Sequence, residues 1–261
     1  MIYLWISLGI FGGIALIFAF VWLNNSLLKV TRYNEDIGLG KELKIIHLSD
    51  LHGKSFGRKN ARLIKKIAAE KPDIILITGD IVHKYRERDK TVALELVSAL
   101  SALAPVAFSA GNHEMRNKGY RFFRKDLIEA GAVVLDDCSA DICGLTVTGL
   151  NCASLKNGTA DKIKPVNAQS AVLLAHMPQF IQTYARAGFG LVLSGHAHGG
   201  QWRIPFTGVG FYAPGQGVFP KLTSGVHACG NTRMIISRGL GNSQCPLRLF
   251  NPPEIVVIKI K

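Results

Sequence analysis

Side chains that commonly bind metal ions follow five apolar segments of this chain, each at the point where the segment ends. The spacings D-x-H and H-x-H put two donors on one loop. The set mixes carboxylate, amide and imidazole donors, which suit divalent ions such as Mn, Fe, Zn or Co better than Ca. The candidate ligands are Asp50, His52, Asp80, Asn112, His176, His196 and His198, with His113 directly after Asn112.

The segment 73–80, Asp-Ile-Ile-Leu-Ile-Thr-Gly-Asp, predicts how these residues are positioned. Its unbroken apolar run is typical of a strand buried on both faces. Asp80 follows at the carboxyl end of that strand, the edge where open α/β sheets place their ligands. A buried carboxylate needs a positive partner. We therefore expect Asp80 to meet two metal ions at once, with the other donors completing their coordination.

The remaining elements are predicted from apolar runs and helical spacing. A glycine- and proline-rich stretch, 205–220, is expected to form a shaped loop over the site. Predicted strands cover 43–49, 73–79, 105–110, 132–135, 145–150, 171–175, 190–194, 233–237 and 255–260, and predicted helices cover 58–70, 89–103, 119–130 and 179–187.

The first 28 residues contain no charged side chain. Residues 2–23 are long enough to cross a bilayer as a helix. Tyr3, Trp5 and Trp22 stand near its ends, where interfacial aromatic residues are common. The alternative is a cleaved secretory signal, which needs a basic start and a small-residue cleavage site, and neither is evident. The sequence therefore predicts a retained single-pass anchor.

The positive charges nearest this anchor, beginning with Lys29 and Arg32, follow its C-terminal end. The positive-inside rule then places the rest of the chain on the cytoplasmic side of the cell membrane. The expected organisation is an anchor over 1–28, a linker over 29–40 and one catalytic domain over 41–261.

The composition favours an anionic partner. The net charge is +13, and 48% of the residues are hydrophobic, enough for a sizeable core. Such a balance suits phosphate esters, nucleic acid or an acidic lipid surface. The five cysteines are odd in number and form no C-x-x-C pair, so neither a disulfide framework nor a structural zinc site is indicated.

The order D-x-H, G-D, G-N-H-E, H and G-H-x-H resembles the calcineurin-like metallophosphoesterases. The stretches 195–201, 238–241, 246–248 and 251–254 look like its membrane-anchored bacterial branch, with phosphodiesterases similar to YkuE and YaeI and a relation to UDP-2,3-diacylglucosamine pyrophosphatases. The resemblance covers most of the chain after residue 41. It implies an α/β fold of four layers, an αββα sandwich, preceded here by the transmembrane helix.

The resemblance also implies residue roles. Asp50, His52, Asp80 and His198 would hold one metal ion, and Asp80, Asn112, His176 and His196 the other, with Mn favoured over Zn, Fe or Co. His113 would assist the leaving group, and Glu114 would orient His113. The family's protein phosphatases carry an arginine and an aspartate just after the G-D motif. This chain has residues 81–84, Ile-Val-His-Lys, which counts against a phosphoprotein substrate.

Physical chemistry supports the same reading. Two metal ions about 3.5–4 Å apart can clamp the non-bridging oxygens of a phosphoryl group and lower the pKa of a bridging water, whose hydroxide then attacks phosphorus. An imidazole such as that of His113 suits protonation of the departing oxygen near neutral pH. The expected activity is hydrolysis of a phosphodiester or pyrophosphate bond, with a lipid-linked substrate as one option.

Alternatives remain at this stage. A single histidine at a strand end is usually a structural hydrogen-bonding residue. For His47 core packing or a bond behind the site is expected, and for His83 and His227 surface or loop roles. Aromatic residues Tyr120, Phe122 and Phe123 beside Arg121 and Arg124 leave open a nuclease or cyclic-nucleotide phosphodiesterase, although no nucleic acid is expected as a stable partner. A non-catalytic membrane scaffold is the least favoured, and the oligomeric state is unknown.

Overall fold

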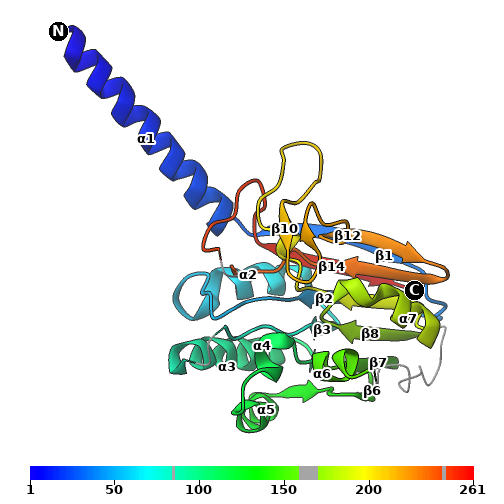
Figure 1. The fold of residues 1–261 in the computed structure, drawn as a ribbon. Coiled ribbons are helices and arrows are strands. Elements are labelled where there is room, and N and C mark those ends of the chain that lie inside the picture. The colour runs from blue at the N-terminus through cyan, green and yellow to red at the C-terminus, as the bar shows by residue number, and fades with distance from the viewer. Residues whose placement is uncertain (84–85, 159–169, 243–244) are drawn as a thin grey trace.

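The computed structural model describes residues 1–83, 86–158, 170–242 and 245–261. Two six-stranded sheets face each other, and helices cover their outer faces (Figure 1). The first sheet has the order β1-β14-β2-β3-β4-β5, with bounds Lys29–Glu35, Glu254–Ile260, Leu43–Leu48, Ile74–Ile77, Val106–Phe108 and Ala132–Val134. The second has the order β12-β13-β9-β8-β7-β6, with bounds Gly225–Cys229, Thr232–Ile236, Leu191–Ser194, Ala171–Ala175, Leu145–Leu150 and Cys138–Ile142.

The central strands of both sheets run parallel. In the first sheet β2, β3, β4 and β5 are parallel, and β14 joins them antiparallel to β2. In the second, β7, β8, β9 and β13 are parallel, and the antiparallel strands β6 and β12 form the edges. Central strands such as β3 are buried on both faces, as expected for parallel strands covered on each side.

Three apolar clusters separate four layers. One lies between the first sheet and the helices α2, α3 and α5 (Ala61–Glu70, Glu87–Ser101, Tyr120–Glu129). The middle cluster joins the two sheets, with Ile45, Leu174 and Val256 among its members. The third lies between the second sheet and the helices α6 and α7 (Cys152–Lys156, Ile181–Ala187). The predicted four-layer αββα sandwich is confirmed.

Short elements complete the fold. They are α4 (Asn112–Met115), the hairpin β10–β11 (Tyr212–Ala213, Gly217–Val218), and the 3-10 turns η1, η3 and η4 (Arg58–Asn60, Pro178–Phe180, His198–Gly200). The predicted helices and strands are present among the described residues, with ends shifted by a few positions.

The stretch 29–40, expected to be a linker, contains β1. This strand pairs in parallel with β14 along its whole length, from Lys29 opposite Glu254 to Glu35 opposite Ile260. The backbone hydrogen bonds that a free linker would give to water are made inside the sheet instead. The chain therefore passes from the first helix into the sandwich almost directly.

The N-terminal helix α1 (Ile2–Ser26) projects away from the body (Figure 1). None of its residues is buried, although its sequence is almost entirely apolar as far as Leu23. By length and composition it is a candidate membrane span. Such a surface is unfavourable in water, because an all-apolar helix is normally covered by protein or lipid.

Candidate metal centre

All the predicted ligand residues lie at the carboxyl ends of strands, on one edge of the sandwich. Both sheets contribute, and the donors meet where the two sheets face each other. The positions are Asp50 and His52 after β2, Asp80 after β3, Asn112 and His113 after β4, His176 after β8, and His196 and His198 after β9.

Close backbone packing brings these loops together. Gly79 has a φ of +76°, and a Cβ atom there would lie 2.1 Å from the backbone nitrogen of Gly111. No other residue fits that position, so the loops after β3 and β4 touch through their backbones. The N–H of His113 then donates to Oδ1 of Asp80 at 2.8 Å.

Five of the ligand candidates have a left-handed backbone. Their φ angles are +53° at Asp50, +50° at His52, +51° at Asp80, +66° at His196 and +48° at His198. Aspartate, asparagine and histidine adopt this region several-fold more often than other non-glycine residues. Left-handed residues that cluster in this way usually mark functional loops, because surrounding structure must hold each in place.

One group of donors consists of Asp50, His52 and His198. The Nε2 atoms of the two histidines lie 3.1 Å apart, and Nε2 of His198 lies 3.4 Å from Oδ1 of Asp50. Asp50 and His198 are buried, and the side chain of His52 is 2% exposed. Three donors of this kind, within 4.8 Å of one another, can hold one metal ion.

A second group consists of Asp80, His176 and His196. Nε2 of His176 lies 3.1 Å from Oδ2 of Asp80 and 3.2 Å from Nδ1 of His196. The same Oδ2 atom lies 3.9 Å from Nε2 of His52, which belongs to the first group. Asp80 thus faces both groups, and so does Asp50, whose Oδ1 atom lies 3.9 Å from Nε2 of His176.

The side-chain oxygen of Asn112 lacks a binding partner within the described part of the protein. Its Oδ1 atom is buried and has no hydrogen-bond partner among the described residues, while the residue itself is 4% exposed. An unsatisfied buried amide oxygen costs free energy, about 1–3 kcal/mol. A metal ion beside Asp80 would satisfy it, so this residue fits the role that the sequence suggests.

The electrostatics of the cluster call for positive charge. Burial raises the pKa of Asp50 and Asp80, but the histidines around them outweigh it and hold the pKa of each carboxyl below its ordinary value. Burial lowers the pKa of His196 to about 4 and also lowers that of His198. For His176 burial is outweighed by Asp80 and Asp50, and its pKa is raised to about 10. Two buried carboxylates close together, with His196 and His198 held neutral and His176 protonated beside Asp80, form a site where a cation can replace that proton.

The surroundings of His113 differ from the sequence expectation. Its Nδ1 atom donates to the carbonyl oxygen of His83 at 2.8 Å, which leaves Nε2 facing Asp80 at 3.9 Å. The Glu114 carboxylate accepts backbone N–H groups of Asp80 at 2.7 Å, Gly111 at 2.9 Å and Val82 at 3.2 Å. Glu114 therefore fixes the two loops, and the His83 carbonyl orients the imidazole.

Sequence reasoning did not assign the residues that support His198 from behind. Arg248 is fully buried, donates to the carbonyl oxygens of Arg238 and Gly241, and lies 3.5 Å from Nδ1 of His198. The amide of Asn251 donates to the carbonyl oxygen of His198 at 2.7 Å. Both belong to the C-terminal stretches singled out by the resemblance, which was the available signal.

Of the other three histidines, His47 and His227 lie where a structural role is expected, whereas His83 forms a third possible donor group with His52 and His113. His47 is buried in β2, and its Nε2 atom shares a hydrogen bond with Oγ1 of Thr78 at 2.8 Å. His227 lies in β12, and its ring contacts the carbonyl oxygen of Ser224. His83, expected in a loop, lies 3.3 Å from Nδ1 of His52 through its own Nδ1 and is part of the histidine cluster.

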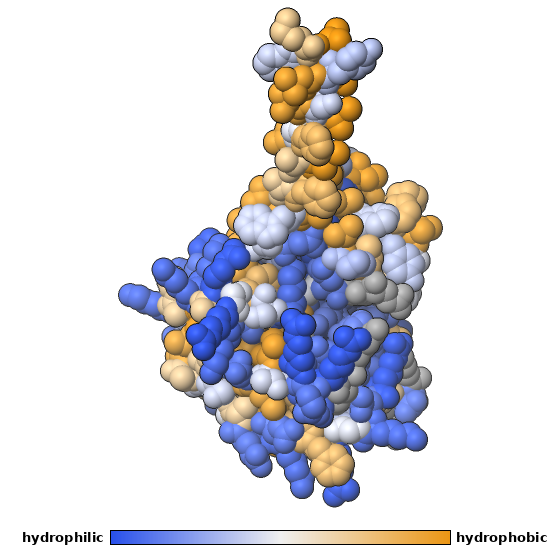
Figure 2. Space-filling model, turned by 90° about the vertical axis from the view of Figure 1, so that its left-hand side faces the viewer, coloured by the Kyte–Doolittle hydropathy of each residue, from blue (hydrophilic) through white to orange (hydrophobic). Residues whose placement is uncertain are grey.

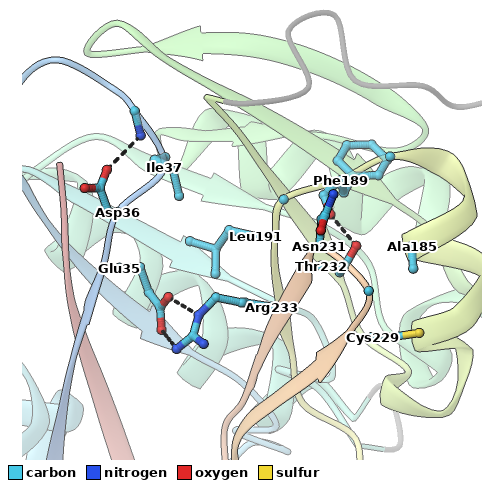
Figure 3. Close-up of a pocket in the computed structure, with 14 residues that line it drawn as sticks. Glu35, Asp36, Ile37, Ala185, Phe189, Leu191, Cys229, Asn231, Thr232 and Arg233 are labelled. Atoms are coloured by element: carbon cyan, nitrogen blue, oxygen red, sulfur yellow. Dashed lines mark hydrogen bonds and ion pairs between the residues drawn. The ribbon is translucent and has the colours of Figure 1, made fainter.

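A cavity of about 710 Å³ lies at the opposite end of β9, near Leu191, whereas the metal ligands follow Ser194. Figure 3 shows Glu35 and Arg233 in this cavity, joined by two hydrogen bonds of 2.5 and 2.9 Å. These charges satisfy each other, and no cluster of metal-binding donors among the described residues lies there. The volume of this cavity therefore does not indicate where the metal-binding donors lie.

Comparisons with known proteins agree with this geometry. Residues 43–200 match the calcineurin-like phosphoesterase family. A metallophosphoesterase of Aquifex aeolicus is 28% identical over 93% of this chain and 95% of its own length. The metallophosphoesterase YkuE of Bacillus subtilis is 29% identical over 84% of this chain and 79% of its own. The phosphodiesterase YaeI of Escherichia coli is 29% identical over 83% of this chain and 82% of its own.

The family match spans β2 to the turn that carries His198, so it includes every strand end from which the donors project. The two-sheet fold, the clustered carboxylates and imidazoles, and the relatives' names lead to one conclusion. This chain belongs to the calcineurin-like phosphoesterase family and is a metal-binding hydrolase of phosphoric esters.

Proposed function

We propose that this protein is a membrane-anchored phosphohydrolase that uses two divalent metal ions to cleave a phosphodiester or pyrophosphate bond. The observation that carries the proposal is the pair of donor groups that meet at Asp80. One group contains Asp50, His52 and His198, and the other contains His176 and His196. A shared carboxylate between two such groups is what a two-metal site requires.

The residues present fit two ions. Asp50, His52, Asp80 and His198 would hold the first, and Asp80, Asn112, His176 and His196 the second. The unpartnered Oδ1 of Asn112 supports the second assignment. When bound, two such ions supply positive charge to phosphoryl oxygens and make a water molecule more acidic. Mixed nitrogen and oxygen donors suit Mn, Zn, Fe or Co, and we favour Mn.

The chain's own groups perform the proton transfer. With Nδ1 of His113 donating to the His83 carbonyl, its Nε2 atom is free to hold the proton that the leaving oxygen takes. The side chain of His113 is 23% exposed, so its ring can reach a substrate at the surface of the site. Glu114 keeps the loops of Asp80 and Gly111 in register, which fixes the distance between His113 and the metal ligands.

The anchor proposal depends on α1. Its 25 residues rise about 37 Å at 1.5 Å per residue, more than the roughly 30 Å of a hydrocarbon core. Lys29 and Arg32 follow directly, which favours a cytoplasmic catalytic domain in the cell membrane. Because β1 belongs to the sheet, we place the boundary at Lys29, with residues 1–28 as anchor and the remainder as one domain.

The substrate is proposed from two observations. A relative named as a phosphodiesterase supports a diester. The exposed apolar surface of α1 and the net charge of +13 support an anionic substrate linked to lipid. Of the residues that argue against a phosphoprotein, 81–83 are described, and residue 84 lies outside the described residues.

The aromatic cluster of α5 gives the nuclease alternative little support. Phe123 is buried in the core, and both Tyr120 and Arg124 bond to Asp136. Phe122 remains exposed in this group, and one aromatic ring makes a poor platform for successive bases.

The test is turnover of bis(p-nitrophenyl) phosphate by the full-length protein, stripped of metal and reloaded with Mn, Zn, Fe or Co. We expect turnover to need two ions per chain, measured by elemental analysis of the active sample. A second panel compares nucleoside-diphosphate lipids, glycerophosphodiesters and nucleotides. Turnover that persists after stripping would contradict the metal proposal. Equal rates on soluble diesters and on lipid analogues in detergent would remove the lipid proposal alone.

A further inference from the structure

Six exposed apolar side chains form a rim beside the metal centre. Phe206 is fully exposed, and the others are between 39% and 59% exposed. Three of them are in contact, because the ring of Phe211 stacks on Trp202 and contacts Phe219 edge-on, and the other three line one cavity. The apolar rim consists of Trp202, Ile204, Phe206, Phe211, Phe219 and Phe250.

The apolar rim lies against the last turns of α1. The rings of Phe250 and Phe20 are 5.0 Å apart between centroids. A cavity of about 260 Å³ is lined by Asn24 of α1 together with Ile204, Phe206 and Phe250. The loop that carries Phe206 rises on the same side of the body as α1 (Figure 1). In Figure 2 the apolar colouring of α1 continues onto the body at the base of the helix.

The depth of the rim follows from this contact. A helix needs about 20 residues to cross the hydrocarbon core, so a span that begins at Ile2 leaves it near Val21. Phe20 then lies at the edge of the core, and Phe250 lies at the same depth because the two rings touch. Aromatic side chains are enriched at this depth in membrane proteins.

The rim is also joined to the metal ligands. It begins four residues after His198, and the N–H of Phe211 donates to the carbonyl oxygen of Gly200 at 3.0 Å. Gln201 donates its backbone N–H to the carbonyl oxygen of His198 at 3.0 Å. The rim and the loop of His198 therefore form one continuous, hydrogen-bonded unit.

We infer that the apolar rim inserts into the interfacial layer of the bilayer and holds the metal centre against the lipid headgroups. The inference rests on the proposed role of α1 as an anchor. It adds a second, monotopic contact that fixes how the body is tilted. It also narrows the substrate class to amphiphiles whose phosphoester lies at headgroup depth. A water-soluble substrate would need no such surface beside the site.

The first experiment measures depth by tryptophan fluorescence. The full chain has three tryptophans, and Trp5→Phe, Trp22→Phe and Trp202→Phe remove them. Into this background Phe206→Trp is introduced, and Phe122→Trp on α5 is the matched control, because Phe122 is also an exposed aromatic residue. Both proteins are reconstituted in vesicles of equal parts phosphatidylcholine and phosphatidylglycerol, with and without acyl chains brominated near the headgroup.

We expect tryptophan at position 206 to emit at shorter wavelength and to lose most of its emission to bromine, while position 122 is unaffected. Flotation of the vesicles shows separately whether the protein is anchored. If the protein floats but tryptophan emission at position 206 is quenched no more than at position 122, insertion of the rim is contradicted, while the proposal of the anchor stands. Protein that fails to float overturns the anchor as well. Short-wavelength emission without bromine quenching means that a second copy covers the rim, which also overturns the inference.

The second experiment asks what the contact does. Phe206→Asp should lower turnover of a diacyl phosphodiester in vesicles several-fold and leave bis(p-nitrophenyl) phosphate turnover unchanged. Phe122→Asp should change neither rate. An equal loss on both substrates would show damage to the metal centre rather than to membrane contact, and an unchanged vesicle rate would contradict the inference.

Discussion

The charged groups near the two ends of β9 differ in whether they find partners within the protein. Near Leu191, Glu35 and Arg233 form a two-point ion pair in a cavity of about 710 Å³, and each charge is satisfied by the other (Figure 3). Beyond Ser194, two buried carboxylates are surrounded by imidazoles, and the amide oxygen of Asn112 has no partner among the described residues. The first end is electrostatically complete within the chain, and the second needs a ligand.

This difference shows which property identifies a site. In the large cavity the charges of Glu35 and Arg233 are already paired with each other, so neither needs a ligand to be satisfied. In the crowded metal cluster the buried amide oxygen of Asn112 has no partner among the described residues, so no contact within the protein offsets the free-energy cost of its burial. The end of β9 beyond Ser194 is called the metal edge, and the end near Leu191 with Glu35 and Arg233 the ion-paired edge. Substitutions at the two edges should therefore have different effects.

The largest effect is expected from Asp80→Asn. This change removes the negative charge that both donor groups face but keeps the size and left-handed backbone of the residue. Turnover of bis(p-nitrophenyl) phosphate should fall by at least about 10³-fold, with loss of bound metal measured by elemental analysis. Glu35→Gln makes the same chemical change at the ion-paired edge and should leave turnover unchanged. Full activity in the Asp80 variant would refute the site assignment.

His113→Gln should give the next largest loss, about 10²–10⁴-fold in kcat, because the proton for the leaving group is no longer supplied. Metal content should stay at the wild-type level, since His113 lies outside the two donor groups that meet at Asp80 and its own group, with His52 and His83, contains no carboxylate. A diester with a more acidic leaving group should recover much of the rate. Loss of metal in this variant would instead make His113 a ligand.

A pH effect is expected from His47 behind the metal edge. Burial lowers its pKa to about 3, so between that value and about 6.5 the unfolded chain binds a proton that the folded chain does not. Stability therefore falls as pH drops from 7.5 to 5, with a contribution of about 2 kcal/mol from this group. His47→Gln should reduce the pH slope of the urea midpoint. An unchanged slope would assign it to other groups.

The smallest effect is expected at the ion-paired edge. Changing both Glu35 and Arg233 to glutamine removes a pair in which the arginine side chain is 52% exposed. The Glu35 side chain is 4% exposed, but replacing both partners leaves no buried charge without a partner. The free energy of unfolding should therefore fall by less than about 1 kcal/mol, and turnover should stay the same. If catalysis falls in this double variant, the cavity contributes to function and the contrast drawn above is wrong.

The sequence predicted the interior of the fold better than its margins. Strands such as β3 and β9 are continuous apolar runs, so the residue types alone are enough to predict them as buried strands. The sequence did not reveal the small hairpin β10–β11, nor three strands of the two large sheets, β1, β6 and β12, which are all edge strands. Their residues are partly exposed and polar, and their pairing depends on a neighbour distant in the chain, as for β1 with β14.

The site was predictable for the same reason. Each donor follows an apolar run, and parallel strands bring such positions to one edge. The supporting contacts were not predictable, because they involve backbone atoms. The His83 carbonyl that holds His113, and the carbonyl of His198 that binds Asn251, exist for every residue type. Only the folded chain shows which of them is used.

The left-handed backbone at five of the donor positions limits how this centre can change over evolution. Lengthening a side chain by one methylene, as in Asp80→Glu, keeps the carboxylate but introduces a residue that disfavours this conformation. Metal coordination and the left-handed backbone thus favour the same three residue types, aspartate, asparagine and histidine. Evolution can change the bound metal by substitutions among these three residue types without altering the loops. A change to glutamate or cysteine ligands would require a different loop backbone.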